Sequence, residues 1–174
     1  MKAKVLTAIL IFGILAGCFS SCKNSPRLYI GEYTYQSDGK INIGLITGGV
    51  DVPITDKMGQ MQIMKGDEKG KVSIIKTSIT GDIKRFSGKV SDGELSIDEY
   101  TYEKEIKLDT IINGKAKVTY TAKGKLRDNT IVFDDNYSGF FTEKETGAVG
   151  TIKSDNAITI AKLNNVLYVY DTRD

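Results

Sequence analysis

The sequence contains no histidine and no tryptophan, and it has only two cysteines and two prolines among its 174 residues. Without histidine, the chain cannot build a histidine-based catalytic triad, a histidine proton shuttle, a histidine-ligated zinc site or a haem held by an axial histidine. Two cysteines are too few for a disulfide framework that could carry the fold. The scarcity of proline leaves room for uninterrupted strands.

Charge and motifs exclude further classes of function. Lysine and arginine number 24 and aspartate and glutamate 22, so no basic excess attracts nucleic acid. The sequence lacks the phosphate-binding patterns G-x-x-x-x-G-K-[ST] and G-x-G-x-x-G, and it lacks the nucleophile pattern G-x-S-x-G. No histidine is present to activate a serine. We therefore expect a protein that is not an enzyme and that uses no cofactor.

The first 17 residues, MKAKVLTAILIFGILAG, have the pattern of a secretory signal peptide. Two lysines precede an uncharged, mostly apolar run over residues 5–17. A membrane-spanning helix needs about 20 apolar residues, so the run is short for that role. The segment carries two lysines and no acidic residue, so its removal leaves equal numbers of basic and acidic residues.

Leu15-Ala16-Gly17-Cys18 resembles the lipobox of bacterial lipoproteins. The resemblance implies cleavage before Cys18, lipidation of its thiol and anchoring in the cell envelope at the outer membrane. Cys22 is the alternative lipidation site. No acidic run follows either cysteine, which favours the periplasmic side over the cell surface. The predicted organisation is a signal peptide over 1–17, a lipidated tether over 18–26 and a β-barrel domain over 27–174.

Residues 115–126, KAKVTYTAKGKL, show the clearest structural pattern in the chain. Every odd position is polar, and the even positions alternate with them over twelve residues. Because this pattern repeats every two residues, one face of the segment lies on a core and the other lies in water, which predicts a half-buried β-strand. The lysines protect the outer face against aggregation.

Similar segments, separated by turn sequences, fill the rest of the chain. Turns are predicted at 37–40, 47–49, 66–70, 80–82, 91–93, 113–114, 127–129, 154–156 and 164–165. Residues 107–112 are expected to pair with the 115–126 strand. A bulge is expected at Ile74-Ile75, where the apolar alternation changes phase. A short helix over residues 55–64 is an alternative to a strand there. The fold class is therefore all-β, an antiparallel meander barrel of about eight to ten strands.

The chain resembles the calycin-like (lipocalin-like) lipoproteins of Bacteroidetes. The resemblance rests on Gly31-Glu32-Tyr33 in the first strand, on residues 70–74 after a charged turn, and on 124–126 followed by 129–131. It covers residues 27–171. Tyr33 stands where lipocalins carry the tryptophan of their G-x-W motif. The resemblance implies a fold and a location more than an activity.

Tyrosine is the most suggestive candidate for ligand contact, because its flat ring and polar tip suit stacking on ring ligands. The candidates share strand faces: Tyr29, Tyr33 and Tyr35 on one, and Tyr100 and Tyr102 on another. The alternative is that these tyrosines fill the barrel interior or pair across strands.

Acidic residues offer weaker candidates. Asp134 and Asp135 could contribute oxygen ligands to a cation, although a solvated turn is the simpler interpretation. A denser acidic stretch is interleaved with lysines and contains Asp98, Glu99, Glu103, Glu105 and Asp109. A pair of such carboxylates, held about 5–10 Å apart, could perform hydrolysis.

Three functions follow from the sequence. The leading hypothesis is a cell-envelope lipoprotein that binds a small hydrophobic or glycan-like ligand. The alternative is a structural or inhibitory lipoprotein that binds another protein and has a filled barrel. The third is a carboxylate-based hydrolase. The volume of any cavity separates the first two, and two carboxylates facing each other in a cleft would favour the third.

Overall fold

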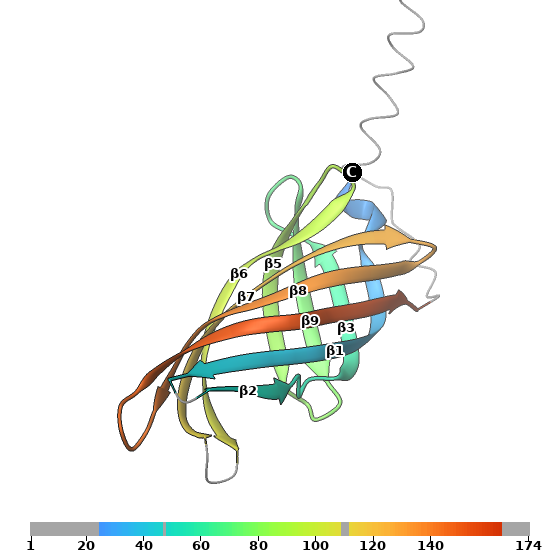
Figure 1. Cartoon of the computed structure of the whole chain (residues 1–174). Helices are drawn as coiled ribbons and strands as arrows, with labels where there is room; N and C mark the ends of the chain where they lie inside the picture. The colour runs from blue at the N-terminus through green and yellow to red at the C-terminus, as the bar shows by residue number, and fades with distance from the viewer. Residues whose placement is uncertain (1–24, 47, 109–111, 165–174) are drawn as a thin grey trace, which may run out of the picture.

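The computed structural model describes residues 25–46, 48–108 and 112–164 (Figure 1). The predicted signal peptide, Cys18 and Cys22 lie outside these residues, as does most of the predicted tether. A single 3-10 turn, η1 (Pro26–Leu28), precedes a series of strands. No helix within the described ranges is long and apolar enough to cross a membrane.

Nine strands form one antiparallel sheet that closes on itself. They are β1 (Gly31–Leu45), β2 (Gly48–Pro53), β3 (Met58–Lys65), β4 (Lys71–Ser78), β5 (Ile83–Ser91), β6 (Glu94–Leu108), β7 (Ile112–Arg127), β8 (Thr130–Glu143) and β9 (Val149–Leu163). Strands β3 to β9 follow one another as neighbours, and β9 pairs with β1 to close a barrel of eight strands. The ninth, β2, adds to β1. The predicted fold class is confirmed, and the architecture is consistent with a calycin-like barrel.

Alternation of side chains builds the core. In β7 the even positions Ala116, Val118, Tyr120 and Ala122 are buried, as the pattern of residues 115–126 predicts. The inward positions of the other strands complete one apolar cluster. The lysines of β7 lie on the outer face opposite acidic residues of its neighbours, for example Lys117 opposite Glu103. This part of the outer face is therefore solvated and carries charges of both signs.

Two predicted hairpin turns have the expected backbone conformation. Asp92 and Gly93 have φ of 53° and 71° between β5 and β6, and Asp128 and Asn129 have φ of 47° and 62° between β7 and β8. Positive φ at both central residues matches the right-handed twist of the flanking strands. These turns fix the registers of β5 with β6 and of β7 with β8.

Two other predicted turns are irregularities inside long strands. Residues 37–40 lie within β1 and residues 154–156 within β9, where the two strands pair with a register shift between Asp38 and Lys40. Gly39 has φ of 114°, and a Cβ there would lie 2.6 Å from the Asn156 carbonyl oxygen. The polar residues of these two ranges therefore bend β1 and β9 at the same place along their pairing. The sequence of either segment by itself cannot show that it bends with a partner strand.

Residues 58–65 form β3, so the short helix left open for 55–64 does not form there. Two further predictions are wrong. Asn113-Gly114 lie inside β7 because β6 continues to Leu108 and pairs with them. The bulge expected at Ile74-Ile75 is absent: β4 alternates regularly, so Ile74 points inward, Ile75 outward and Lys76 inward. A lysine at an inward position explains why the apolar phase looked broken.

The barrel has one closed end and one open end. At the closed end, the Tyr29 hydroxyl beside η1 donates a hydrogen bond to the Gly93 carbonyl oxygen (2.8 Å) and accepts one from the Leu126 backbone N–H (3.4 Å). Tyr33 donates to the Tyr29 carbonyl oxygen at 2.7 Å. These contacts tie the start of the domain to the β5–β6 turn and the end of β7.

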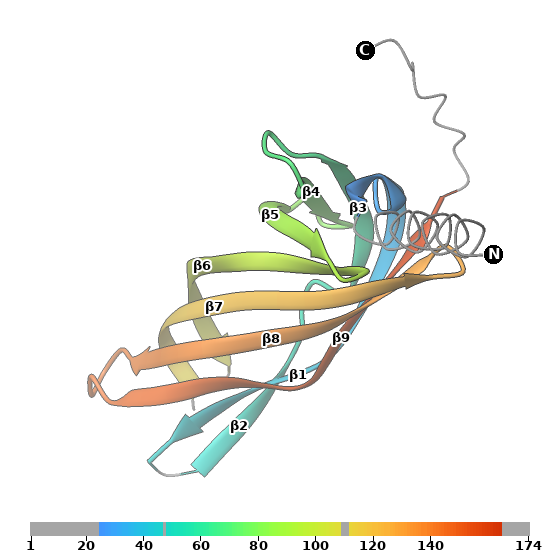
Figure 2. The same ribbon diagram turned by 90° about the horizontal axis from the view of Figure 1, so that it is seen from above.

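At the open end, three strands stop short. β3, β4 and β5 have 8, 8 and 9 residues, whereas β1, β6, β7, β8 and β9 have 14 to 16. β5 pairs with β6 only from Gly88 to Ser91, so β6 from Tyr100 onward pairs only with β7 among the described residues. The wall is therefore interrupted between β2 and this part of β6, and Figure 2 shows β5 and β6 diverging from the turn that joins them. We call this interruption the notch.

Candidate functional site

A cavity of about 570 Å³ lies in the notch. It is bounded by β2 and the segment that follows it, by the β4–β5 turn, and by β6 from Tyr102 to Leu108. Its lining residues are Ile41, Ile43, Val52, Pro53, Ile54, Thr55, Asp56, Thr80, Asp82, Lys84, Tyr102, Glu103, Lys104, Glu105, Ile106, Lys107, Leu108, Val118, Tyr137 and Ile152. The volume is within the range of about 300–1,000 Å³ that is usual for small-molecule sites.

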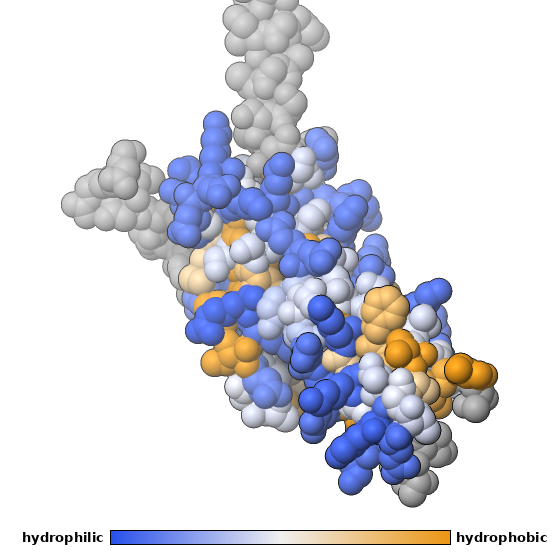
Figure 3. Space-filling model, turned by 90° about the vertical axis from the view of Figure 1, so that its left-hand side faces the viewer, coloured by the Kyte–Doolittle hydropathy of each residue, from blue (hydrophilic) through white to orange (hydrophobic). Residues whose placement is uncertain are grey.

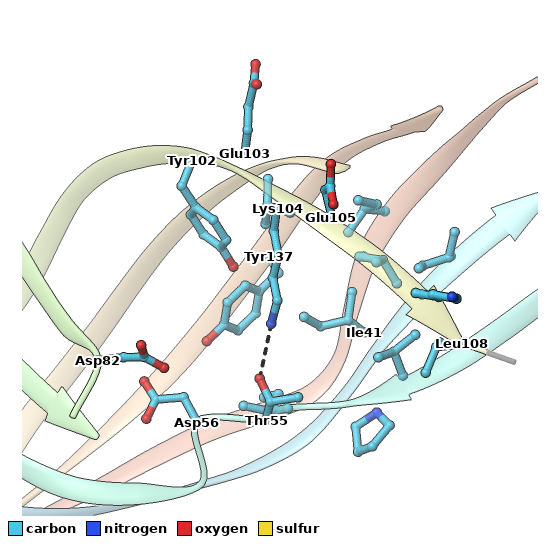
Figure 4. A pocket seen from close by; sticks show the side chains of 18 of the residues that line it. Ile41, Thr55, Asp56, Asp82, Tyr102, Glu103, Lys104, Glu105, Leu108 and Tyr137 are labelled. Atoms are coloured by element: carbon cyan, nitrogen blue, oxygen red, sulfur yellow. Dashed lines mark hydrogen bonds between the residues drawn. The ribbon is translucent and has the colours of Figure 1, made fainter. Parts of the chain in front are cut away.

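The floor of the cavity is apolar. Ile43, Val118 and Ile152 are inward residues of β1, β7 and β9, and each is at most 4% exposed. Ile41 and Leu108 lie together at one end (Figure 4). This end offers aliphatic surface without a buried charge, so it suits the hydrocarbon part of a ligand.

The opposite end of the cavity is polar. Figure 4 shows the hydroxyls of Tyr102 and Tyr137 on the same side as the carboxylates of Asp56 and Asp82. Lys84 also lines the cavity and places its Nζ atom 5.6 Å from the centre of the Tyr102 ring. The cavity is thus amphipathic along its length.

Asp56 is surrounded by hydrogen-bond donors and cations. Its Oδ1 accepts a short hydrogen bond from the Tyr35 hydroxyl. Its Oδ2 lies 3.5 Å from Lys76 Nζ and 3.6 Å from Lys84 Nζ. One carboxylate is therefore shared by two ammonium groups.

A chain of hydrogen bonds leads from Lys76 into the barrel. Lys76 Nζ donates to Ser37 Oγ (3.1 Å), and Ser37 Oγ lies 2.7 Å from Thr159 Oγ1. Thr159 Oγ1 donates to Asp135 Oδ2 (2.6 Å), and Asp135 Oδ1 accepts from the Tyr120 hydroxyl (3.0 Å). Because Thr159 donates to Asp135, its oxygen accepts from Ser37, so the hydroxyl hydrogens of Ser37, Thr159 and Tyr120 are all used. Burial of these polar groups is tolerated because each has a partner.

Burial dominates the electrostatics of this interior. It lowers the pKa of Lys76 and raises the pKa of Asp135, in both cases against the effect of the neighbouring opposite charges. It also raises the pKa of Tyr102 to about 12 and that of Tyr137 further. Both hydroxyls at the polar end of the cavity therefore remain protonated donors at neutral pH.

Aromatic rings connect the cavity with the core. Tyr102 stacks on Tyr100 (5.8 Å between centroids), and Tyr100 meets Phe86 edge to face (5.0 Å). Phe86 contacts Tyr120 at 5.4 Å, and Tyr120 contacts Tyr137 at 4.9 Å. Such contacts fix ring positions and are worth about 0.5–1.5 kcal/mol each beyond burial. They hold the polar wall of the cavity in place.

A hydrogen bond crosses the mouth of the notch. Lys104 of β6 extends toward Thr55 and donates to its Oγ1 at 3.4 Å (Figure 4). Glu103 belongs to the lining, but its side chain is exposed and points away from the cavity in Figure 4. Because the Lys104 contact is long and exposed, it adds little to stability, and a ligand can displace it.

The tyrosines suggested by the sequence divide into two groups. Tyr29 and Tyr33 are at most 2% exposed and bond to backbone carbonyls, so they belong to the closed end of the barrel. Tyr35 reaches the cavity only through Asp56. Tyr102 lines the cavity, and Tyr100 supports it from behind.

Among the described residues the acidic candidates do not converge, and Asp109 lies outside these residues. Asp134 and Asp135 lie in β8, not in a turn, and point to opposite faces, Asp134 outward and Asp135 inward. Asp98 forms an ion pair with Lys71 at 2.9 Å. Within the described residues, no group of three cysteine or acidic side chains is placed to hold a metal ion.

Several site residues were missed by reading the sequence. The sequence assigned no functional role to four of them, Asp56, Lys84, Tyr137 and Thr159, and Asp56 lies in residues 55–64, which were left open to a short helix. Lys76 did leave a signal, because a strict alternation through β4 places this lysine on the inner face. A charged residue at an inward position marks a buried polar network.

Outside the notch, hydrophilic side chains cover most of the face shown in Figure 3, with smaller hydrophobic areas between them. No protein-family model matches the chain, and no curated protein sequence matches it.

Proposed function

We propose that this protein is a binding protein of the cell envelope that holds a small amphipathic ligand in the notch cavity. The observation that carries the proposal is the cavity of about 570 Å³ with an aliphatic floor and a polar end. A barrel that served only as a scaffold would gain stability by extending β4 and β5 to fill the notch. A small ligand with one apolar and one polar part matches the space that they leave.

The site supports binding better than hydrolysis. Asp56 and Asp82 both line the cavity, but Asp56 is already engaged by Tyr35, Lys76 and Lys84. A general acid needs a carboxyl whose pKa is raised. Asp135 has a raised pKa, but it does not line the cavity, and its two oxygens accept from Tyr120 and Thr159.

The binding experiment uses N-phenyl-1-naphthylamine, a neutral apolar dye whose fluorescence rises in an apolar site. The wild-type protein should bind it saturably, and Ile106→Trp should weaken binding because the larger indole takes up part of the cavity. Ile160→Trp is the matched control, since Ile160 lies on the outer face of β9 and is 47% exposed. Equal dye binding by the two variants would contradict the proposal.

The location in the envelope rests on the sequence. The proposed attachment is a lipidated Cys18 at the end of the Leu15-Ala16-Gly17-Cys18 pattern. In bacterial cells given labelled palmitate, the wild type should incorporate label and Cys18→Ala should not. Labelling that survives Cys18→Ala and is lost in Cys22→Ala would move the anchor to Cys22, and no labelling of the wild type would end the proposal of a lipid anchor.

A second candidate function is protein binding at the two strand edges of the notch. Among the described residues, β2 pairs only with β1, and β6 from Tyr100 onward only with β7. Exposed edges can accept further strands. A protein partner that added strands would slow amide hydrogen exchange in residues 102–108, whereas a small ligand would leave the edge amides exchanging freely.

A further inference from the structure

We propose that the polar end of the notch cavity, formed by Lys84, Tyr102 and Tyr137, binds a carboxylate, so that the ligand is a single-chain amphiphile with a carboxylate head. The inference rests on the proposed function and specifies its ligand class. It places the head against these three side chains and the chain along the floor toward Ile41 and Leu108.

The two tyrosine hydroxyls are donors without an acceptor. Among the described residues, neither Tyr102 nor Tyr137 has a hydrogen-bond partner for its hydroxyl. Within the part of the chain that the structure describes, no fully buried side-chain polar atom lacks a partner, so neither hydroxyl is fully buried, and both residues line the cavity. Tyr137 is nevertheless only 9% exposed and is held by the Tyr120 ring at 4.9 Å. A fixed, nearly buried donor that points into a cavity indicates an acceptor on the ligand.

Lys84 supplies the third donor and the charge. Its ammonium shares Asp56 with Lys76 and lies 3.6 Å from Oδ2, beyond a normal hydrogen bond. The Lys84 ammonium can therefore donate to a further acceptor. Lys84, Tyr102 and Tyr137 also line a second, smaller void of about 10 Å³, and the Lys84 Nζ atom lies 5.6 Å from the centre of the Tyr102 ring.

The combination selects a carboxylate over other heads. A hydroxyl offers one oxygen and no charge, whereas a carboxylate offers two oxygens and can accept from all three donors. An ammonium head would face Lys84 and two hydroxyl hydrogens. The carboxylates of Asp56 and Asp82 line the same end and oppose an anion, but Asp56 is already engaged by Tyr35, Lys76 and Lys84. The Oδ2 atom of Asp82 accepts from Thr80 (3.2 Å), and this residue is exposed.

The test compares three ligands with the same chain: dodecanoate, dodecanol and dodecyltrimethylammonium, each displacing N-phenyl-1-naphthylamine from the full folded domain at pH 8. Dodecanoate should bind about tenfold more tightly than dodecanol, and the cationic amphiphile more weakly than both. Equal affinity of dodecanoate and dodecanol, or a preference for the cation, would overturn the carboxylate assignment and leave the proposed function standing. Failure of all three ligands and of the dye would overturn both.

Substitutions that should weaken binding and one that should strengthen it are combined, because misfolding can only weaken binding. Lys84→Met and Tyr137→Phe should each weaken dodecanoate about three- to tenfold and leave dodecanol within about twofold. Asp82→Asn should tighten dodecanoate about twofold or more, because it removes a repelling charge and keeps an acceptor for Thr80. Lys123→Met, on the outer face of β7, is the charge-matched control and should change neither affinity. If Lys84→Met and Lys123→Met behave alike, the assignment is wrong.

Discussion

The hydrogen-bond chain from Lys76 to Asp135 predicts a large effect from one small substitution, Thr159→Val. Thr159 is 1% exposed and Asp135 6%, so solvent cannot replace the lost bonds. The change removes the 2.6 Å bond to the Asp135 carboxylate and the 2.7 Å contact with Ser37 while it keeps the shape of the side chain. A bond to a buried charged group is worth about 1.5–3 kcal/mol and a neutral one about 1 kcal/mol. We therefore expect a loss of about 3 kcal/mol.

The effect should depend on pH. Burial raises the pKa of Asp135 above its ordinary value, and the bond from Thr159 opposes this rise. A carboxyl with a raised native pKa contributes stability while it is protonated, and this contribution is lost as pH rises through the native pKa. Without the bond from Thr159, the pKa of Asp135 in the folded protein is higher still, and the loss of stability with rising pH continues to a higher pH. The destabilisation by Thr159→Val should therefore be smaller at pH 4 than at pH 8.

Urea unfolding followed by circular dichroism at both pH values measures the prediction. The control is Thr151→Val, an exposed position on the same strand, which should change the free energy of unfolding by less than about 0.5 kcal/mol. A Thr159→Val loss below about 1 kcal/mol, or one equal at pH 4 and pH 8, would refute the account of the buried network.

Three further predictions follow from single contacts. Gly39→Ala should cost about 2–3 kcal/mol in urea unfolding, because φ of 114° and a carbonyl oxygen 2.6 Å away leave no room for a Cβ; a neutral result would contradict the bend in β1. Tyr29→Phe should cost about 1 kcal/mol, because it removes the 2.8 Å bond to Gly93; an unchanged urea midpoint would show that this bond does not stabilise the closed end. Burial raises the pKa of Tyr137 in the folded protein, so this tyrosine ionises first in the unfolded chain, and the free energy of unfolding should fall above pH 10. Tyr137→Phe should make this fall shallower between pH 9 and 11. Identical pH profiles of the variant and the wild type would contradict the prediction.

The fold could be predicted because alternation alone specifies it. Residues 115–126 place apolar and polar side chains on opposite faces, and β7 follows that pattern. The turns at 91–93 and 127–129 contain residues that tolerate positive φ. Strand lengths could not be predicted, because the bend at Gly39 depends on Asn156, which is more than a hundred residues away.

The candidate site could be predicted only in part. Tyr102 was found from its residue type, whereas Asp56 and Lys84 were not, because their role depends on β4 and β5 ending early. Lys76 was visible as a break in the apolar phase, but the break was attributed to a bulge and not to a buried ion pair with Asp56. Residues that face a cavity across several strands leave no local pattern in the sequence.

The most direct test of the central claim maps dodecanol binding onto the isoleucine methyl groups by NMR. Isoleucines 41, 54, 106 and 152 line the notch cavity, whereas Ile74 and Ile131 lie in the barrel core away from it. If the cavity holds the ligand, titration should shift the first group and leave the second unchanged. Shifts confined to Ile74 and Ile131, or to exposed Ile158 and Ile160, would contradict the account.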